Sequence, residues 1–259
     1  MSTREPDPSS CFRTVQHSGT PVGERISIKI SVDSTEVAVP TYLSRPPGST
    51  SATATRNVLL YFSDVFGPFY INSQLMQDYF AGQGLTVVGI DYFDGDPVGP
   101  HLAEPGFDRA VWRDKSVARA VQWAPRWVES VRAMFGSEDV SYHAVGYCFG
   151  APYALDLAGT GWLASAAVAH PTNLQESHFQ EAKAPLFFGC AETDHAFPAS
   201  ARRRAEDILV ERHANYYFQT FSGVSHGFAT RGDPGVGSER WAKEECARGM
   251  AGWFGRFGG

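Results

Sequence analysis

Cysteine is scarce in this sequence, and the spacing of the few present excludes the sites that cysteines usually build. Four cysteines occur in 259 residues, with no CxxC pair, and no Asn-x-Ser/Thr acceptor for N-glycosylation is found. Secreted disulfide-rich domains and zinc sites both need paired or clustered cysteines. We therefore expect free thiols, a reducing compartment and a cytoplasmic protein.

Long apolar runs and an excess of positive charge are also missing. Apolar runs such as 58–62 and 163–169 are far shorter than the ~20 residues that cross a bilayer. Residues 1–10 are polar and hold two prolines, unlike a secretory signal. The formal net charge is −6, so neither membrane lipid nor nucleic acid is an expected partner.

Motifs for cofactor binding are absent as well. The sequence has no HExxH, no cluster of cysteine and histidine, and no pair of carboxylates at a metal-site spacing. Neither GxGxxG nor GxxxxGK[ST] follows an apolar strand. We expect no metal and no organic cofactor.

What is present predicts one globular domain of the α/β class. Apolar residues make up 43% and charged residues 19% of the chain, which supports a large core. The length fits a single domain over residues 1–259, with residues 1–22 as an extended N-terminal segment. Between Glu24 and Leu43 apolar residues fall on alternate positions, which predicts a pair of antiparallel strands.

From residue 57 onward, strand-like runs alternate with helical stretches, which is typical of parallel strands joined by crossover helices. The predicted strands lie at 57–62, 85–90, 140–146, 164–169, 184–189 and 214–221. Helices are predicted at about 70–83, 113–135, 149–159, 200–212 and 239–254, with Pro125 breaking the second. The result is a mainly parallel sheet flanked by helices, in which reactive groups lie at the carboxyl ends of strands.

The clearest chemical motif is Gly146-Tyr147-Cys148-Phe149-Gly150, between an apolar strand and a helix. In a nucleophile elbow the middle residue adopts strained backbone geometry and presents its side chain above the sheet, and flanking glycines avoid clashes. A thiol with a reference pKa of ~8.5 becomes a thiolate near neutral pH beside a helix N-terminus and a histidine. Cys148 is therefore the predicted nucleophile.

Two later strand ends supply partners for Cys148. Asp194 follows the predicted strand 184–189, with Glu192 as the alternative acid, and His226 follows the strand 214–221. The chain order nucleophile, acid, base is the order of an α/β-hydrolase triad. Asp64, after the strand 57–62, is an auxiliary candidate, and the backbone N–H groups of Val65 and Phe149 are the expected oxyanion hole.

Other residues are weaker candidates for a substrate pocket. They are Tyr92, Phe93, Tyr147, Phe149, Trp162 and His170. Each has an alternative role, in the core or as a structural hydrogen-bonding group. Cys190 is interpreted as a buried small residue. His101, His178, His195 and His213 are interpreted as having no functional role.

Together these residues resemble the dienelactone hydrolase family, a branch of the α/β-hydrolase fold that uses cysteine where most relatives use serine. The resemblance covers nearly the whole chain and is carried by GYCFG, SDVFGP, GLTVVGIDYFDGDP, AETD and SHGF. The segment CFRTVQHSGTPVG resembles the N-terminal extension of fungal members. This resemblance implies hydrolysis of an unsaturated lactone or activated ester through a thioester on Cys148, without a cofactor.

Two positions depart from the family pattern. Family members usually carry glutamate at the position of Asp64, and the resemblance implies that this carboxylate holds and then activates the resting thiol. The arginine expected near the base, for a substrate carboxylate, is shifted by one residue to Arg231. These departures leave the identity of the substrate open.

The sequence leaves three functions to compare. The first is a cysteine-dependent lactone or ester hydrolase. The second is an isomerase or cyclase acting on a polyketide-like intermediate of secondary metabolism. The third is a non-catalytic binding protein, against which the intact Cys148, Asp194 and His226 argue. A monomer and a homodimer are both compatible with the sequence.

Overall fold

The computed structural model describes residues 14–49 and 56–258 of the chain. They form two compact units: an N-terminal unit of residues 19–143, and a C-terminal unit of residues 14–18 and 144–257. In the part of the chain described, no helix is both long and apolar enough to span a bilayer.

The N-terminal unit holds four strands in the order β1-β2-β4-β3. β1 (Glu24–Val32) and β2 (Thr35–Ser44) pair antiparallel, as predicted, and β2 is also antiparallel to β4 (Thr86–Ile90). β3 (Asn57–Phe62) pairs with β4 in parallel. Residues 58–62 and 86–90 are buried throughout, which explains why these strands read as continuous apolar runs rather than alternating ones.

Helix α1 (Ile71–Gly82) packs against β4 and β2. A short 3-10 helix, η3 (Gly99–Ala103), which the sequence did not predict, follows β4. Helix α1 matches the predicted helix 70–83 to within one residue at each end.

Helix α2 (Arg109–Phe135) is unbroken, so the predicted break at Pro125 is wrong. A proline inside a helix removes one hydrogen bond and costs about 3 kcal/mol. Packing of α2 on the sheet offsets this cost, because α2 contacts β1 and the fully buried Trp127 donates its indole N–H to Thr41 Oγ1 of β2 at 2.9 Å. The helix also starts earlier than predicted because the Asp108 carboxylate accepts two backbone N–H groups of the first turn.

The C-terminal unit continues the alternation of strand and helix. Its strands follow the order β5-β6-β7-β8, with bounds β5 (Ser141–Tyr147, of which residues 144–147 lie in this unit), β6 (Ser165–Ala169), β7 (Leu186–Thr193) and β8 (Tyr216–Ser225). β6, β7 and β8 are parallel. The helices are η4 (Cys148–Gly150), α3 (Ala151–Ala158), α4 (Glu176–Gln180), α5 (Ala199–Glu211), α6 (Phe228–Arg231) and α7 (Gly237–Phe257).

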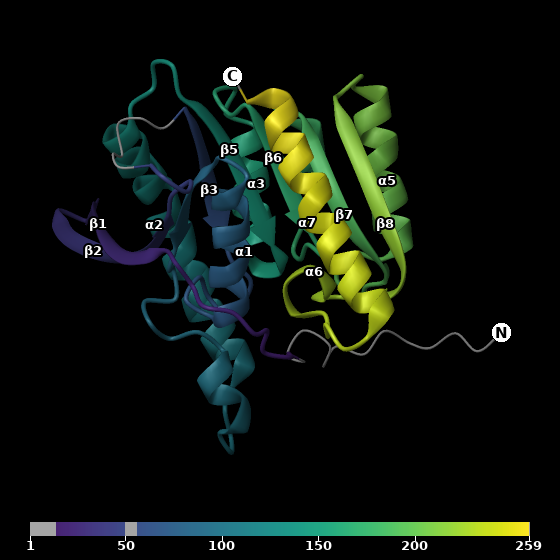
Figure 1. The fold of residues 1–259 in the computed structure, drawn as a ribbon, viewed down its shortest axis with the longest axis horizontal. Coiled ribbons are helices and arrows are strands. Elements are labelled where there is room, and N and C mark those ends of the chain that lie inside the picture. Colours follow the sequence, from purple (N-terminus) through teal and green to yellow (C-terminus); the bar gives the residue numbers. More distant parts are fainter. Residues whose placement is uncertain (1–13, 50–55, 259) are drawn as a thin grey trace. The chain divides into compact units, whose positions relative to one another are not determined.

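Helices α3 and α7 pack on the strands of this unit, and α7 crosses β6, β7 and β8 (Figure 1). The sequence predicted α3, α5 and α7 with bounds that differ by up to three residues, but not the short α4 and α6. Strands β7 and β8 run four residues beyond their predicted ends. The predicted α/β class, with mainly parallel strands and an antiparallel N-terminal pair, is confirmed.

The described part of the predicted N-terminal segment, residues 14–22, has no helix or strand. Its His17 ring is buried, and Nε2 lies 2.9 Å from the carbonyl oxygen of Gly232. This contact holds residues 14–18 on the C-terminal unit. Residues 1–13, which include Cys11, lie outside the described residues.

Candidate active site

Cys148 occupies a sharp turn between β5 and α3. Its φ is +49°, a left-handed conformation that costs a residue other than glycine about 1–3 kcal/mol. Gly146 makes the turn possible, because a Cβ there would stand 2.6 Å from the Cα of Ala151 and from the carbonyl oxygen of Gly150. Of the two glycines predicted to permit an elbow, Gly146 is therefore at a position where the backbone crowds the turn.

The pairing of β7 with β8 determines where Asp194 and His226 lie. The two strands are parallel, and Thr193 is opposite Ser225 after an irregularity that follows Ala191. Asp194 and His226 directly follow the last residues of these strands, so the register brings them side by side. The four-residue extensions of β7 and β8 are thus what places the acid next to the base.

Cys148, His226 and Asp194 form one hydrogen-bonded chain. His226 Nδ1 lies 2.9 Å from Asp194 Oδ1 and 3.0 Å from Oδ2, and His226 Nε2 lies 3.2 Å from Cys148 Sγ. All three residues are buried, with 2%, 4% and 5% of Cys148, His226 and Asp194 exposed. This arrangement has the connectivity of nucleophile, base and orienting acid.

Electrostatics favour a charged His226. Burial opposes the imidazolium, but the neighbouring Cys148 sulfur and Asp194 carboxylate outweigh it and raise the pKa of His226 to about 9. A protonated His226 beside the sulfur stabilises a thiolate by the same attraction. The pair is therefore suited to a thiolate and imidazolium at neutral pH.

Asp194, rather than the alternative acid Glu192, is the partner of His226. The Oδ1 atom of Asp194 also accepts the backbone N–H groups of Ala196 and Phe197, at 2.8 and 3.1 Å. These bonds fix the carboxylate that faces the imidazole. Glu192 instead accepts the backbone N–H of Gly223 at 2.8 Å and is exposed.

His170 lies against the imidazole of His226. It follows β6, has a φ of +36°, and is fully buried. Burial, followed by the charges of His226 and Arg231, holds the pKa of His170 well below its usual range, so His170 is neutral. Both of its ring nitrogens lack a hydrogen-bond partner among the described residues.

Arg231 ends α6 and folds back towards the base. Gly227, directly after His226, has a φ of +93°, and a Cβ there would stand 2.1 Å from Nη2 of Arg231. Arg231 is 4% exposed. The glycine after the histidine therefore makes room for a buried guanidinium one turn away.

One group of three side chains in the described part of the chain could hold a metal ion, although no metal was expected from the sequence. Asp194, His195 and His226 offer ligand atoms that all lie within 4.8 Å of one another. His226 Nδ1 already bonds the Asp194 carboxylate, so an ion bound through those atoms would replace that bond. The ring of His195, for which no role was predicted, lies 5.0 Å from that of His226.

Two predicted pocket aromatics have the character of core residues. Tyr92 and Phe93 are fully buried, and the Tyr92 hydroxyl donates to the carbonyl oxygen of Ser63. Phe93 stacks on Trp112 with ring centroids 5.5 Å apart. Of the two roles considered for these side chains, the structure favours the core.

Tyr147 and Phe149 flank Cys148 and are buried. The Tyr147 hydroxyl donates to Met250 Sδ at 3.5 Å, which also indicates a core position. Phe149 is the second residue of η4, and its ring lies 5.8 Å from that of Tyr153. Trp162 lies in the turn before β6 and is partly exposed.

Asp64 and Val65 belong to the N-terminal unit and follow β3. The Asp64 Oδ1 atom accepts the backbone N–H of Phe66 at 2.9 Å, and its carbonyl oxygen accepts that of Gly67 at 3.0 Å. The Val65 carbonyl oxygen accepts the N–H of Val98 at 3.0 Å. Their roles towards Cys148 stay predictions.

The remaining described cysteines lie in surroundings that disfavour a thiolate. Burial raises the pKa of the Cys190 thiol to about 12, and burial together with Cys190 raises that of Cys246 further. Both are free and buried. Neither is a candidate nucleophile, in agreement with the interpretation of Cys190 as a small core residue.

The sequence of the chain is similar to known hydrolases over almost all of its length. The family model of the dienelactone hydrolase family matches residues 39–258. Dienlactone hydrolase 1 of Gibberella moniliformis is 38% identical over 251 residues, covering 94% of this chain and 91% of the relative. Hydrolase tropI of Talaromyces stipitatus is 32% identical over 260 residues, covering 97% of each chain.

Solved structures of low sequence identity share the fold. A dienelactone hydrolase-like promiscuous phosphotriesterase from metagenomic libraries superposes with a TM-score of 0.67 at 16% identity, over 92% of this chain and 99% of the other. The apo form of Thermogutta terrifontis esterase 2 gives a TM-score of 0.61 at 16% identity, over 90% and 94%. With the match over residues 39–258 and fungal relatives above 30% identity, the chain belongs to the dienelactone hydrolase family, has its α/β-hydrolase fold, and is a hydrolase of the ester- and lactone-cleaving type.

Proposed function

We propose that this hydrolase opens a lactone or cleaves an activated ester through a thioester on Cys148, with His226 as base and acid and Asp194 as the orienting carboxylate. The observation that supports it is the buried chain from Asp194 through His226 to Sγ, in which one imidazole bonds both neighbours. A binding protein has no use for such a chain.

In the first half of the reaction, the Cys148 thiolate attacks the carbonyl carbon and forms a C–S bond. The electron pair of the C=O bond moves to oxygen and gives a tetrahedral oxyanion. When this collapses, the C–O bond of the ester or ring breaks, and His226 gives its Nε2 proton to the leaving oxygen. The products are a thioester and an alcohol, which in a lactone stay within one molecule.

In the second half, the now neutral His226 accepts a proton from water, which attacks the thioester carbonyl. The C–S bond breaks, the thiolate returns to its place beside the imidazolium, and a carboxylic acid is released. Asp194 keeps the Nδ1–H of His226 directed at itself, so that Nε2 faces the reacting atoms. These steps use no metal or organic cofactor.

The oxyanion hole and the auxiliary carboxylate are part of the proposal on the basis of the sequence. Val65, after the first parallel strand, and Phe149, after the nucleophile, occupy the chain positions that donate backbone N–H groups in α/β-hydrolases. Asp64 stands where relatives of the family carry a glutamate that acts on the resting thiol. We assign Asp64 the same role with a shorter reach.

The compartment follows from the proposed chemistry. A thiolate nucleophile is lost by oxidation, so a reducing environment such as the cytoplasm suits it. We also propose that residues 1–259 act as one catalytic domain. Fungal relatives named as hydrolases fit a role in secondary metabolism, which we propose for this chain.

The test is to trap the covalent intermediate. Cys148→Ala should abolish turnover of an activated ester, because no other described residue replaces the sulfur, while the unfolding midpoint stays near that of the wild type. Intact-mass analysis during turnover should show an acyl adduct that maps to Cys148 and is absent from Cys148→Ala. Turnover by Cys148→Ala at the wild-type rate would exclude the mechanism.

Cys148→Ser tests whether the reaction needs a thiolate or would proceed equally well with a serine hydroxyl at the same position. We expect a loss of at least about 100-fold in kcat, because an alcohol needs stronger base assistance than a site prepared for a thiolate gives. Hydrolysis in heavy-oxygen water should place the label in the product carboxylate. An unlabelled product would point instead to the isomerase or cyclase alternative.

A further inference from the structure

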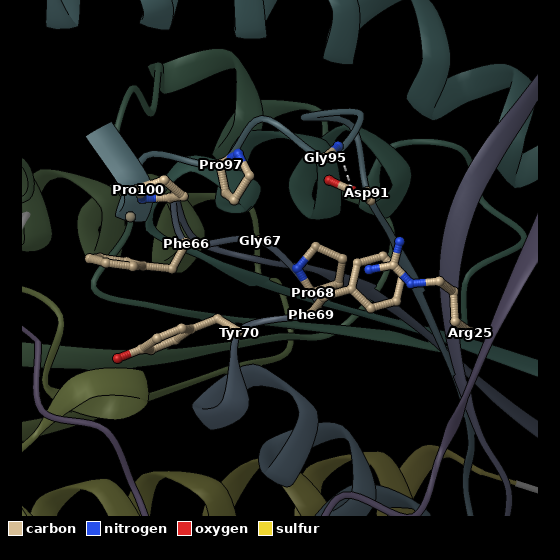
Figure 2. A pocket seen from close by; sticks show the side chains of 11 residues that line it. Arg25, Phe66, Gly67, Pro68, Phe69, Tyr70, Asp91, Gly95, Pro97 and Pro100 are labelled. Atoms are coloured by element: carbon tan, nitrogen blue, oxygen red, sulfur yellow. Dashed lines mark hydrogen bonds between the residues drawn. The ribbon is translucent and has the colours of Figure 1, made fainter. Parts of the chain in front are cut away.

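A cavity of about 270 Å³ lies in the N-terminal unit, in a region that the proposed mechanism does not use. Three segments far apart in the sequence border it: Arg25 from β1, residues 66–70 before α1, and residues 91–100 after β4 (Figure 2). Ligand pockets usually measure about 300–1,000 Å³. This one therefore suits a small molecule.

The walls of the cavity are largely apolar and flat. The rings of Phe66 and Tyr70 lie with centroids 5.0 Å apart and planes inclined by 36°. Pro97 and Pro100 stand on the other side of Phe66 (Figure 2). Rings and prolines of this kind present rigid faces to a planar occupant at little entropic cost.

Arg25 brings a positive charge to one end of the cavity. Its guanidinium carbon lies 3.6 Å above the centroid of the Phe69 ring, so stacking holds the plane of the charged group. Within the described ranges, Arg25 makes no ion pair and no side-chain hydrogen bond, whereas Arg45 is paired with Glu24. The guanidinium donors are therefore available.

Asp91 is the acidic residue that lines the cavity, and its carboxylate is already bonded. One oxygen accepts the backbone N–H of Phe93 at 3.1 Å and the other that of Gly95 at 2.9 Å. The residue is 2% exposed. Asp91 attracts Arg25 electrostatically, but it does not occupy the donors of the guanidinium.

We propose that this cavity binds a small planar carboxylate, with the rings and prolines enclosing its flat body and Arg25 bonding its carboxylate. Arginine is suited to this task because its planar fork matches the two oxygens of a carboxylate. The inference goes beyond the proposed hydrolysis, since binding at this site requires no turnover. The occupant is either a part of the substrate or product, or a separate effector with the same chemistry.

The experiment uses 2-naphthoate as the probe and 2-naphthylmethanol, of the same shape without the charge, as its control. Binding to the full-length wild-type protein is measured by isothermal titration calorimetry. We expect saturable binding of one naphthoate and at least tenfold weaker binding of the alcohol. Arg25→Gln should weaken naphthoate binding about tenfold, which corresponds to one charge-assisted hydrogen-bonded pair.

Two variants make the result specific. Arg25→Lys keeps the charge but loses the fork, and should bind with intermediate affinity. Lys29→Gln removes another exposed cation of β1, one that pairs with Glu36, and should bind naphthoate as the wild type does. Three results would overturn the proposal. They are equal affinity of wild type and Arg25→Gln for naphthoate, equal affinity of the wild type for naphthoate and the alcohol, and no saturable binding of naphthoate.

Two further measurements determine whether the ligand is part of the substrate or a separate effector, and whether its binding depends on catalysis. Naphthoate that competes with an ester substrate indicates that the cavity accepts part of the substrate, whereas non-competitive inhibition or activation indicates an effector site. Naphthoate binding should be unchanged in Cys148→Ala. Thus failure of the thioester mechanism leaves the cavity proposal standing, and the reverse also holds.

Discussion

The ring of His170 stands edge-on to the ring of His226, with centroids 5.1 Å apart and planes inclined by 70°. One of these histidines carries the proton of the proposed mechanism, while the other is held neutral by burial and by the charges of His226 and Arg231. A second positive charge at this distance would compete with the first. The pair therefore divides a charged and an uncharged role between two adjacent imidazoles.

His170→Phe tests the uncharged role. The change keeps a ring and removes two buried nitrogens that have no partner among the described residues, so the unfolding midpoint should not fall. We expect kcat/KM to decrease about tenfold, since those nitrogens are then lost as bonding groups for substrate or the attacking water. His213→Phe, at an exposed histidine with φ of +53°, is the control for an aromatic side chain in left-handed backbone. Unchanged kcat/KM in His170→Phe would leave His170 with packing alone.

The pH dependence of kcat/KM should report the pKa of His226. Its folded-state pKa is raised to about 9, so the imidazolium is present at neutral pH and is lost as pH rises through about 9. Once His226 is neutral it cannot protonate the leaving oxygen, and kcat/KM should fall tenfold per unit above that value. His226→Gln should lose the thiolate ultraviolet absorbance at neutral pH. A fall that begins near pH 7 would contradict the assignment.

Asp194 and Glu192 form a matched pair of acidic residues two positions apart. Asp194→Asn should lower kcat by at least about 100-fold, because the amide cannot hold the Nδ1–H of His226 as the carboxylate does. Glu192→Gln should stay within about twofold of wild type, since Glu192 bonds only a backbone N–H. Combining Asp194→Ala with His226→Ala should add little to the larger single loss. Losses that multiply would mean that the two residues act independently.

Alanine variants of Gly227 and Gly84 distinguish the cost of backbone strain from the cost of steric crowding, because both glycines have a φ of +93°. A Cβ at Gly84 meets nothing within 4 Å, so Gly84→Ala should cost about 1–2 kcal/mol of unfolding free energy. Gly227→Ala should cost more and also reduce kcat, since its Cβ displaces Arg231 next to His226. Denaturant unfolding and steady-state kinetics give the two readouts. Equal costs and unchanged kcat would show that Arg231 moves aside freely.

The proposed role of Asp64, like that of Val65, rests on the sequence alone. If Asp64 restrains the thiol, Asp64→Asn should speed alkylation of Cys148 by iodoacetamide below neutral pH, because a nearby anion disfavours a thiolate. Turnover should fall at the same time. Asp64→Glu should keep activity near or above wild type, and Asp108→Asn, at the start of α2, is the neutral control. Indifference of both readouts to Asp64→Asn would reduce Asp64 to a loop carboxylate.

The sequence predicted much of the site because the relevant signals are local. Gly146 and Gly150 on either side of Cys148 predict a tight turn after a strand, and the structure has such a turn. The sequence predicted Asp194 as the acid but left Glu192 as the alternative, because which of the two faces His226 depends on the irregularity after Ala191 that shifts the register of β7 against β8. The sequence gives no sign of that irregularity.

Other features escaped prediction because they depend on packing. Pro125 was expected to break a helix, but the buried face of α2 outweighs the lost hydrogen bond. The aromatic character of Tyr92 and Phe93 suits a pocket wall and the core equally well, and only the fold shows that neither side chain is exposed. Arg25 was not a candidate in the sequence, because the cavity that it borders is assembled from three segments more than 20 positions apart.

The burial of all three described cysteines has a practical consequence for measuring the protein. Access does not distinguish them, since Cys148 and Cys190 are each 2% exposed and Cys246 is 0% exposed. The charge next to the sulfur does distinguish them, because of these three cysteines only Cys148 has the imidazolium of His226 beside it. In a Cys11→Ser background, a slow electrophile given in excess should consume one thiol per folded molecule. The amount of reagent consumed would then count the competent molecules in a preparation, independently of any substrate.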